Sequence, residues 1–302
     1  MLVVLVGLAV AAFYWLLQHQ SVQITAETDP PNSARGEASS NNFEELSNDS
    51  RNAEPDAETS SSGCLTAEML EAHPMFAGEE ARLDTIAVTG PTIASYRGLK
   101  ASSLEGLAAQ GDTAAMAVLG AISMLKARGI EEQHAVPFLL FENLSLHSYR
   151  EPPLDDPEVR QHYKDAQEWF YKAALRGRLF ALYWVGEMKA RLEGGAVRLG
   201  WIEEAEHAEL SALEQSALMP PSVYNLLAFE VAPQLRTGLI DMYYESLPKH
   251  EYQEGILKDL VDQFERDRKA AYLPPIVVPE STSPPWTEVE EMLCQAAGDR
   301  SD

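Results

Sequence analysis

Two segments of this chain repeat the same spacing of small residues. In residues 107–120 (LAAQGDTAAMAVLG) and 173–186 (AALRGRLFALYWVG), a glycine is followed four residues later by alanine and nine residues later by a second glycine. Glycine readily adopts the left-handed backbone conformation that ends many helices, whereas residues with a Cβ atom resist it. Alanine and glycine at these offsets lie near one face of the helix that follows. Each segment therefore predicts two helices joined by a glycine turn, with small side chains that let the helices approach closely.

An apolar stripe extends this pattern on both sides of the turn. Leu119 and Val185 complete the stripe of the second helix in the two segments, one turn after the alanine. The helix that precedes Gly177 also has a predicted buried stripe. Its members are Ala166, Trp169, Ala173 and Ala174.

These residues resemble the Sel-one-like repeat, a relative of the tetratricopeptide repeat with the approximate pattern A-x-x-W-x-x-K-A-A-x-x-G-x-x-x-A-x-x-x-L-G. The second unit matches the pattern well, whereas the first has Ser103 and Gly106 where the pattern has Trp and Lys. A third, degraded unit follows the second. The matching positions are Ala108, Gly111, Ala115, Leu119 and Gly120 in the first unit, Ala166, Trp169, Lys172, Ala173, Ala174, Gly177, Ala181 and Gly186 in the second, and Ser216, Ala217, Pro220, Tyr224 and Ala228 in the third.

The resemblance implies an all-α fold, a short α-solenoid of antiparallel helix pairs, and a role as an adaptor or scaffold. Because the pattern consists of core positions, it identifies no partner. Gly111 and Gly177 lie 66 residues apart, which exceeds the period of one helical repeat. An insertion at about 130–160, which carries several prolines, accounts for the excess.

The C-terminal part of the chain predicts one long amphipathic helix at about 249–272. In it Tyr252, Ile256, Leu260 and Phe264 recur every four residues, and we expect this helix to cap the repeat array. The proline-rich stretch 274–285 cannot be helical, and a last helix begins at Ser283. The predicted organisation is a membrane anchor or uncleaved signal at 1–20, a disordered acidic linker at 21–63, a helical repeat domain at 64–273, and a proline-rich segment with a C-terminal helix at 274–302.

Residues 1–17 contain neither a charged side chain nor a proline. As a helix they would span about 25 Å, against a bilayer core of about 30 Å. No basic residue precedes this run and bulky residues end it, so a cleavable signal peptide is less favoured than an uncleaved anchor. A cleaved signal, a misplaced start codon and a buried core helix are the alternatives.

Segment 21–63 contains nine acidic and two basic residues and few large apolar ones. Such a segment cannot bury enough surface to offset its conformational entropy, which predicts a flexible tether. The first basic side chain is Arg35, so the positive-inside rule constrains orientation only weakly. The acidic tether favours a body outside the cytoplasm. We expect a single-pass protein of the bacterial inner membrane with a periplasmic body.

The charge balance argues against nucleic acid as a partner. The chain has 23 Lys and Arg against 47 Asp and Glu, a formal net charge of −24, whereas a surface that binds phosphate backbones is basic. We expect the partner to be another protein or a peptide.

The two cysteines, Cys64 and Cys294, lie near the two ends of the predicted body. In an oxidising compartment a disulfide between them would close a long loop and constrain the unfolded state. Two unpaired thiols are the alternative. Without a C-x-x-C spacing, the pair predicts neither a zinc site nor thioredoxin-like chemistry.

The sequence contains no strong catalytic motif. His207 with Glu203 and Glu204 gives one Glu-x-x-His pair, half of the pattern of di-iron bundles, but the second copy is missing, so an acidic solvated face is favoured. His147 and His162 flank acids of the insertion, for which a proline-rich loop before a helix is the simpler interpretation. We therefore expect no metal, no cofactor and no enzymatic activity.

Two aromatic residues, Tyr171 and Trp184, fall outside the predicted stripe and are candidates for binding a partner on an exposed face. Packing against the insertion is the alternative. The function favoured is a membrane-tethered, non-catalytic interaction module of the cell envelope. The alternatives are an envelope enzyme or enzyme subunit with a site between the solenoid and the insertion, and a structural tether to the cell wall.

Overall fold

The computed structural model describes residues 74–87, 95–96, 98–130 and 153–281, which all fall within one compact unit. The predicted anchor, the linker, both cysteines, most of the insertion and the last predicted helix lie outside the described residues. All regular structure in the described part is helical, which confirms the all-α prediction for that part. Its helices are α3 (Pro74–Ile86), α5 (Ala101–Ala109), α6 (Thr113–Ala127), α8 (Pro157–Leu175), α9 (Ala181–Glu193), α10 (Glu204–Glu209), α11 (Ala212–Ala217), α12 (Pro220–Val231), η2 (Pro233–Leu235), α13 (Leu239–Ser246) and α14 (Tyr252–Ala270).

The two predicted glycine turns are present. Gly111 and Gly177 have φ angles of +97° and +106°, in the left-handed region that favours glycine. At each turn the glycine N–H and the next N–H bond back to carbonyls in the last turn of the preceding helix, in the Schellman arrangement. The turns therefore end α5 and α8 by satisfying backbone groups that the helix itself leaves open.

Helix α6 is the most deeply buried helix of the described part. Its side chains are apolar on nearly all sides, and every residue except Thr113, Ser123 and Lys126 is buried. Asp112 begins the helix, because its side chain accepts hydrogen bonds from the N–H groups of Ala114 and Ala115 at 2.9 and 3.0 Å. A helix apolar all round needs neighbours on several sides, and α5 and α8 provide two of them.

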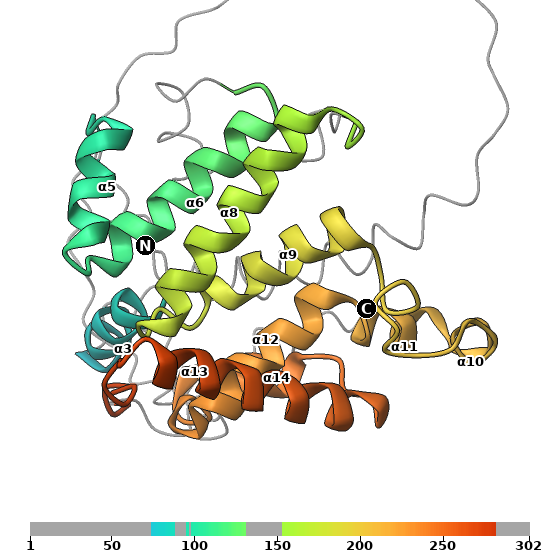
Figure 1. Cartoon of the computed structure of the whole chain (residues 1–302). Helices are drawn as coiled ribbons and strands as arrows, with labels where there is room; N and C mark the ends of the chain where they lie inside the picture. The colour runs from blue at the N-terminus through green and yellow to red at the C-terminus, as the bar shows by residue number, and fades with distance from the viewer. Residues whose placement is uncertain (1–73, 88–94, 97, 131–152, 282–302) are drawn as a thin grey trace, which may run out of the picture. The chain divides into compact units, whose positions relative to one another are not determined.

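The long helices pack one after another along the chain. Helix α5 contacts α6, α6 contacts α8, α8 contacts α9, α9 contacts α12, and α12 contacts α14. Neighbours from α5 to α12 run roughly antiparallel (Figure 1). Helix α14 runs in roughly the same direction as α12, since Gln253 in its first turn donates a hydrogen bond to the carbonyl of Ala217, just before α12. Among the described helices, none has the length and apolar character needed to cross a bilayer.

The predicted close approach at the second glycine of each segment is confirmed, but the helix that approaches is not the hairpin partner. A Cβ atom on Gly120 would lie 2.9 Å from Cδ1 of Phe170 in α8, and one on Gly186 would lie 2.6 Å from the carbonyl oxygen of Pro220 at the start of α12. The glycines thus serve the contact with the next unit. Sequence periodicity identifies a face, but it does not say which helix covers that face.

The predicted buried stripe of α8 is wrong at one position. Phe170 is buried, and Trp169 beside it is only partly buried, with the Lys172 ammonium 4.6 Å from its ring centroid. Neighbouring positions on a helix point about 100° apart, so a stripe can include either one. In α8 the buried position is taken by Phe170, whose ring lies against Gly120 of α6.

The third predicted unit differs from the first two. Its core positions Ala217, Tyr224 and Ala228 are buried, but its first helix is divided into the short helices α10 and α11. The predicted helix 249–272 is present as α14, and residues 274–281 form no helix, as expected.

Helix α3 is held by buried polar contacts. Arg82 and Glu79 form an ion pair at 3.2 Å with both side chains 1% exposed, and Arg82 also donates to the carbonyls of Gln234 and Thr237 at 2.7 and 3.1 Å. Arg178, which follows the second glycine turn, donates to the carbonyl of Asp84 at 2.9 Å. These bonds attach α3 to segments far along the chain.

Candidate functional site

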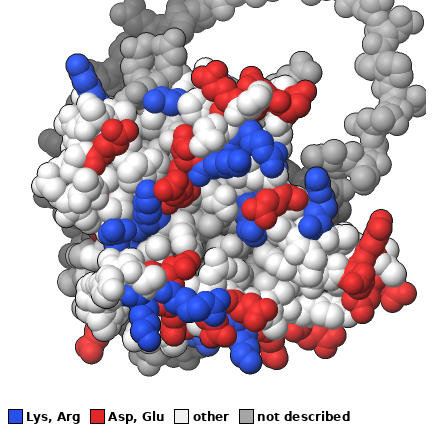
Figure 2. Space-filling view, in the orientation of Figure 1, with Lys and Arg blue, Asp and Glu red and all other residues white. Residues whose placement is uncertain are grey.

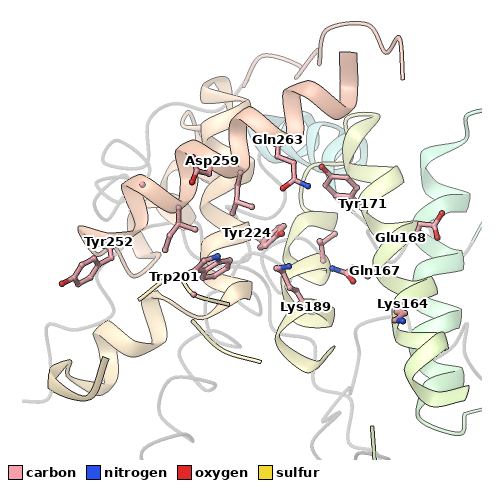
Figure 3. Close-up of a pocket in the computed structure, with 15 residues that line it drawn as sticks. Lys164, Gln167, Glu168, Tyr171, Lys189, Trp201, Tyr224, Tyr252, Asp259 and Gln263 are labelled. Carbon is pink, nitrogen blue, oxygen red and sulfur yellow. The ribbon is translucent and has the colours of Figure 1, made fainter. Parts of the chain in front are cut away.

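A groove with a volume of about 710 Å³ lies between the helix pair α8 and α9 and helix α14. Tyr224 of α12 and Trp201, from the loop after α9, lie between its two walls (Figure 3). The lining residues are Lys164, Gln167, Glu168 and Tyr171 from α8, Val185 and Lys189 from α9, Gly200 and Trp201 from the loop, Tyr224 from α12, and Tyr252, Gly255, Ile256, Asp259, Leu260 and Gln263 from α14.

The groove exists because α14 is attached at its two ends. Near its C-terminus, Phe264 and Asp267 contact Tyr171 of α8. Near its N-terminus, Tyr252 and Ile256 pack with Trp201 against a small apolar cluster formed by Ala196, Ile202 and Leu218. Between these attachments α14 covers α12 and leaves the facing side of α8 open. The apolar stripe of α14 is therefore fully buried only at Phe264.

Tyr171 closes one end of the groove. Its hydroxyl donates a hydrogen bond to Oδ2 of Asp267 at 2.7 Å, and its ring meets Phe264 edge-on with the centroids 6.1 Å apart. Burial and, after it, the bond to Asp267 raise the pKa of Tyr171. The pKa of Tyr224 is also raised, to about 12, by burial and by the charge of Glu193. Both phenols are consequently neutral at physiological pH.

Charged side chains border the groove without giving it one dominant sign. Lys189 pairs with Glu193 at 2.8 Å and Glu168 with Lys172 at 2.6 Å. On the face that Figure 2 shows, acidic and basic side chains are interspersed with uncharged surface between them.

Several polar groups of the groove have no partner within the described part of the chain. Lys164 on α8 and Asp259 on α14 form neither an ion pair nor a hydrogen bond with another described residue, and the same holds for the amides of Gln167 and Gln263. The two walls of the groove thus each offer an amide and one charge to a ligand.

The two aromatic residues predicted from the sequence have different environments. Tyr171 lines the groove, where it packs on α14. Trp184 lies elsewhere, stacked on Phe170 with centroids 6.0 Å apart and edge-on to Tyr183 at 5.2 Å. Three further groove aromatics are not predicted as binding residues by the sequence. Trp201 and Tyr224 carry no sequence signal for such a role, and the periodicity of the last long helix places Tyr252 in its packing stripe.

The histidines considered for metal chemistry do not form a cluster in the described part. His162 lies 3.8 Å from Glu158 in the first turns of α8, and His207 lies on the short helix α10. Among described residues, no group of three or more His, Cys, Asp and Glu side chains is arranged to hold a metal ion. His147, Cys64 and Cys294 lie outside the described residues.

Comparisons of the chain with family models, curated proteins and solved structures found no match. The candidate site therefore depends on its own geometry: a groove of aromatic surface, two amides without partners among described residues, and one charge on each wall. Such a surface is suited to binding.

Proposed function

We propose that this protein is a non-catalytic interaction module that binds a peptide segment of another protein in the groove between α8, α9, α12 and α14. The observation that carries the proposal is the groove itself, an open cavity of about 710 Å³ in which four aromatic side chains meet amides that have no partner among described residues. The four aromatics are Tyr171, Trp201, Tyr224 and Tyr252.

The chemistry of the lining favours a peptide. Aromatic side chains at the centre of a groove supply most of the binding free energy in many peptide interfaces, because they bury a large area at a small entropic cost. A glutamine amide can donate to a backbone carbonyl and accept from a backbone N–H at the same time, and Gln167 and Gln263 lie on opposite walls. We expect the peptide to place an apolar side chain against Trp201.

The charges of Lys164 and Asp259, which have no partner among the described residues, set a direction for the proposed binding. Lys164 on one wall attracts an acidic group and Asp259 on the other attracts a basic one. A peptide with opposite charges on the two sides of its apolar residue would satisfy both. Charge pairs at the rim of an interface set orientation and association rate more than affinity.

The proposal includes the Sel-one-like α-solenoid as the framework of the module. The two Schellman turns, the buried alanines and the glycines at the unit-to-unit contacts support it. Membrane tethering through residues 1–20, with the body in the periplasm, belongs to the same proposal and is supported by the uncharged segment 1–17 and the acidic linker.

Site-specific photocrosslinking in cells tests the groove. A photoreactive amino acid at Gln263 faces the groove, whereas one at Glu265, two residues later on α14, lies on an exposed face of the helix outside the groove lining. We expect a discrete crosslinked product from position 263 and none of that mass from position 265. Adding Trp201→Ala should abolish the product while the circular dichroism spectrum stays helical. Equal products from both positions, or a product that survives Trp201→Ala, would contradict the proposal.

A fractionation experiment tests the tether separately. The full chain should remain in the membrane pellet after alkaline carbonate extraction, and a chain beginning at residue 21 should be found in the soluble fraction. Protease added to spheroplasts should degrade the body of the full chain. Protection of the body from that protease would contradict the periplasmic orientation.

A further inference from the structure

The adjacent ends of three packed helices carry two arginines and a tyrosine, none of which lines the groove. Arg128 is the C-cap of α6, Arg191 lies in the last turn of α9, and Tyr163 lies in the second turn of α8. Because α8 packs between α6 and α9 and runs opposite to both, its start lies beside their ends (Figure 1). The Arg191 guanidinium carbon is 5.9 Å from the centroid of the Tyr163 ring.

Hydrogen-bond donors at this place are buried without acceptors. Nε and Nη1 of Arg128 and the hydroxyl of Tyr163 are shielded from solvent, and none of the three has a hydrogen-bond partner among the described residues. The Tyr163 side chain as a whole is buried, at 1% exposure. A buried donor without an acceptor destabilises the folded state, so such groups are rare in folded proteins unless a ligand or an ordered water accepts from them.

The charge of Arg128 has no counterpart among the described residues. Burial and, after it, the positive charge of Arg128 lower the pKa of Arg191 to about 10. Glu187 lies 3.8 Å from Arg191, but Arg128 forms no ion pair with a described residue. In a chain with a net charge of −24, carboxylates are abundant, yet none of the described ones pairs with Arg128.

A structural role at the helix ends accounts for only part of this arrangement. A cation near a helix C-terminus is stabilised by the helix dipole, which explains why arginine is acceptable at positions 128 and 191. It does not explain donors that are turned away from water and from every described carbonyl. The helix dipole also gives no reason for the buried hydroxyl of Tyr163, which is uncharged.

We propose that Arg128, Arg191 and Tyr163 form a binding site for an oxyanion, a phosphate or carboxylate group. A guanidinium presents parallel N–H donors at the spacing of two such oxygens, and its hydrogen bonds to an anion are short and strong. The anion would accept from Nε and Nη1 of Arg128 and from the Tyr163 hydroxyl, and its charge would compensate the Arg128 guanidinium, which has no ion pair with a described residue. This site is independent of the peptide groove.

Thermal unfolding of the full chain in the presence of defined anions tests the site. Circular dichroism is recorded with increasing sodium phosphate, sodium succinate or sodium chloride at matched ionic strength. We expect phosphate or succinate to raise the melting temperature beyond chloride, with the concentration dependence of a single site. A response to phosphate alone identifies a phosphate group as the ligand, and a response to succinate identifies a carboxylate.

Three variants make the test specific. Arg128→Gln should weaken the anion effect at least tenfold, whereas Arg160→Gln, at an exposed position of α8, should leave it unchanged. Tyr163→Phe should weaken the anion effect while leaving the anion-free protein at least as stable as the wild type, because it removes a buried unpaired hydroxyl; a purely structural hydroxyl would behave in the opposite way. The proposal is overturned if neither anion exceeds chloride, or if Arg128→Gln and Arg160→Gln change the response equally.

Discussion

The hydroxyl of Tyr171 in α8 donates a 2.7 Å hydrogen bond to Asp267 in α14, 96 residues further along the chain. Together with the edge-on contact between Tyr171 and Phe264, this bond attaches the C-terminal part of α14 to α8. The opposite part of α14 is attached through Tyr252 and Ile256. The groove is the space between these two attachments, so its width depends on both.

Tyr171→Phe is expected to destabilise the protein by about 1–2 kcal/mol. The substitution keeps the ring against Phe264 but leaves the Asp267 carboxylate without its donor, and an unpaired, partly buried acceptor is costly. Urea unfolding measures the change. Tyr272→Phe is the matched control, since Tyr272 is 95% exposed, and it should have no measurable effect. Equal stability of the two variants would show that the bond does not hold α14.

Gly186→Ala is expected to destabilise the protein by about 1–3 kcal/mol, because the added Cβ would lie 2.6 Å from the backbone oxygen of Pro220. Gly120→Ala should cost less, since the group it meets is the Phe170 ring, which can move further than backbone. At Gly106, also within a helix, an added Cβ would meet no described heavy atom within 4 Å, so Gly106→Ala should stabilise by about 0.5–1 kcal/mol. Chemical denaturation measures the free energy of unfolding of the three variants. We expect it to be lowest for Gly186→Ala, higher for Gly120→Ala and highest for Gly106→Ala, and any other order would contradict this packing.

The pair Tyr96 and Asp112 predicts a specific acid sensitivity. The Tyr96 hydroxyl donates to Asp112 at 2.6 Å. Burial raises the pKa of Asp112, but the hydrogen bonds from Tyr96 and from the N–H groups of Ala115 and Ala114, with the charge of Arg178, outweigh it and hold the pKa below its usual value. A carboxyl whose pKa is lowered by folding contributes stability above its unfolded pKa of about 3.9, and this contribution is lost as the pH falls through the folded value.

Tyr96→Phe should therefore lower the free energy of unfolding by about 1 kcal/mol near pH 6, and the difference from wild type should shrink as the pH falls below 4. Urea unfolding at pH 6, 4 and 3 provides the measurement. Tyr272→Phe serves again as the control, with the wild-type pH dependence. A difference that stays constant down to pH 3 would rule out the coupling between Tyr96 and Asp112.

Tyr272→Gly is expected to stabilise the protein by about 0.5–1 kcal/mol. Tyr272 follows the end of α14 with a φ of +53°, and this left-handed conformation costs a residue with a Cβ about 1–2 kcal/mol. Glycine relieves that strain but returns part of the gain through the greater entropy of the unfolded chain. Ala271→Gly, one residue earlier at φ −86°, should instead destabilise. The melting temperatures of both variants, compared with that of the wild type, test this expectation. A lower melting temperature for Tyr272→Gly would contradict it.

Much of the helical framework could be predicted because its signals are local. The left-handed φ angles at Gly111 and Gly177 follow from the residue type and its place in the pattern. The long helix α14 is apparent in the sequence from apolar residues every four positions. Such features depend on a few neighbouring residues, so a single sequence contains the information for them.

The candidate site was only partly predictable. Tyr171 is a candidate because it lies outside the apolar stripe of its helix, and it does line the groove. Trp184 is a candidate by the same argument but is stacked on Phe170. Periodicity identifies residues that lie outside the apolar stripe of their helix. It does not tell whether such a residue lines an open groove or packs against another part of the protein.

By itself, the sequence determined where helices end and which residues are small enough for close contact, because backbone conformation and side-chain volume are properties of the residue and its immediate neighbours. The tertiary structure alone decided that Gly120 contacts Phe170 and not the hairpin partner, and that Trp201, Tyr224 and Tyr252 share one groove. These contacts join segments many residues apart, and their formation depends on how whole helices pack to bury apolar surface.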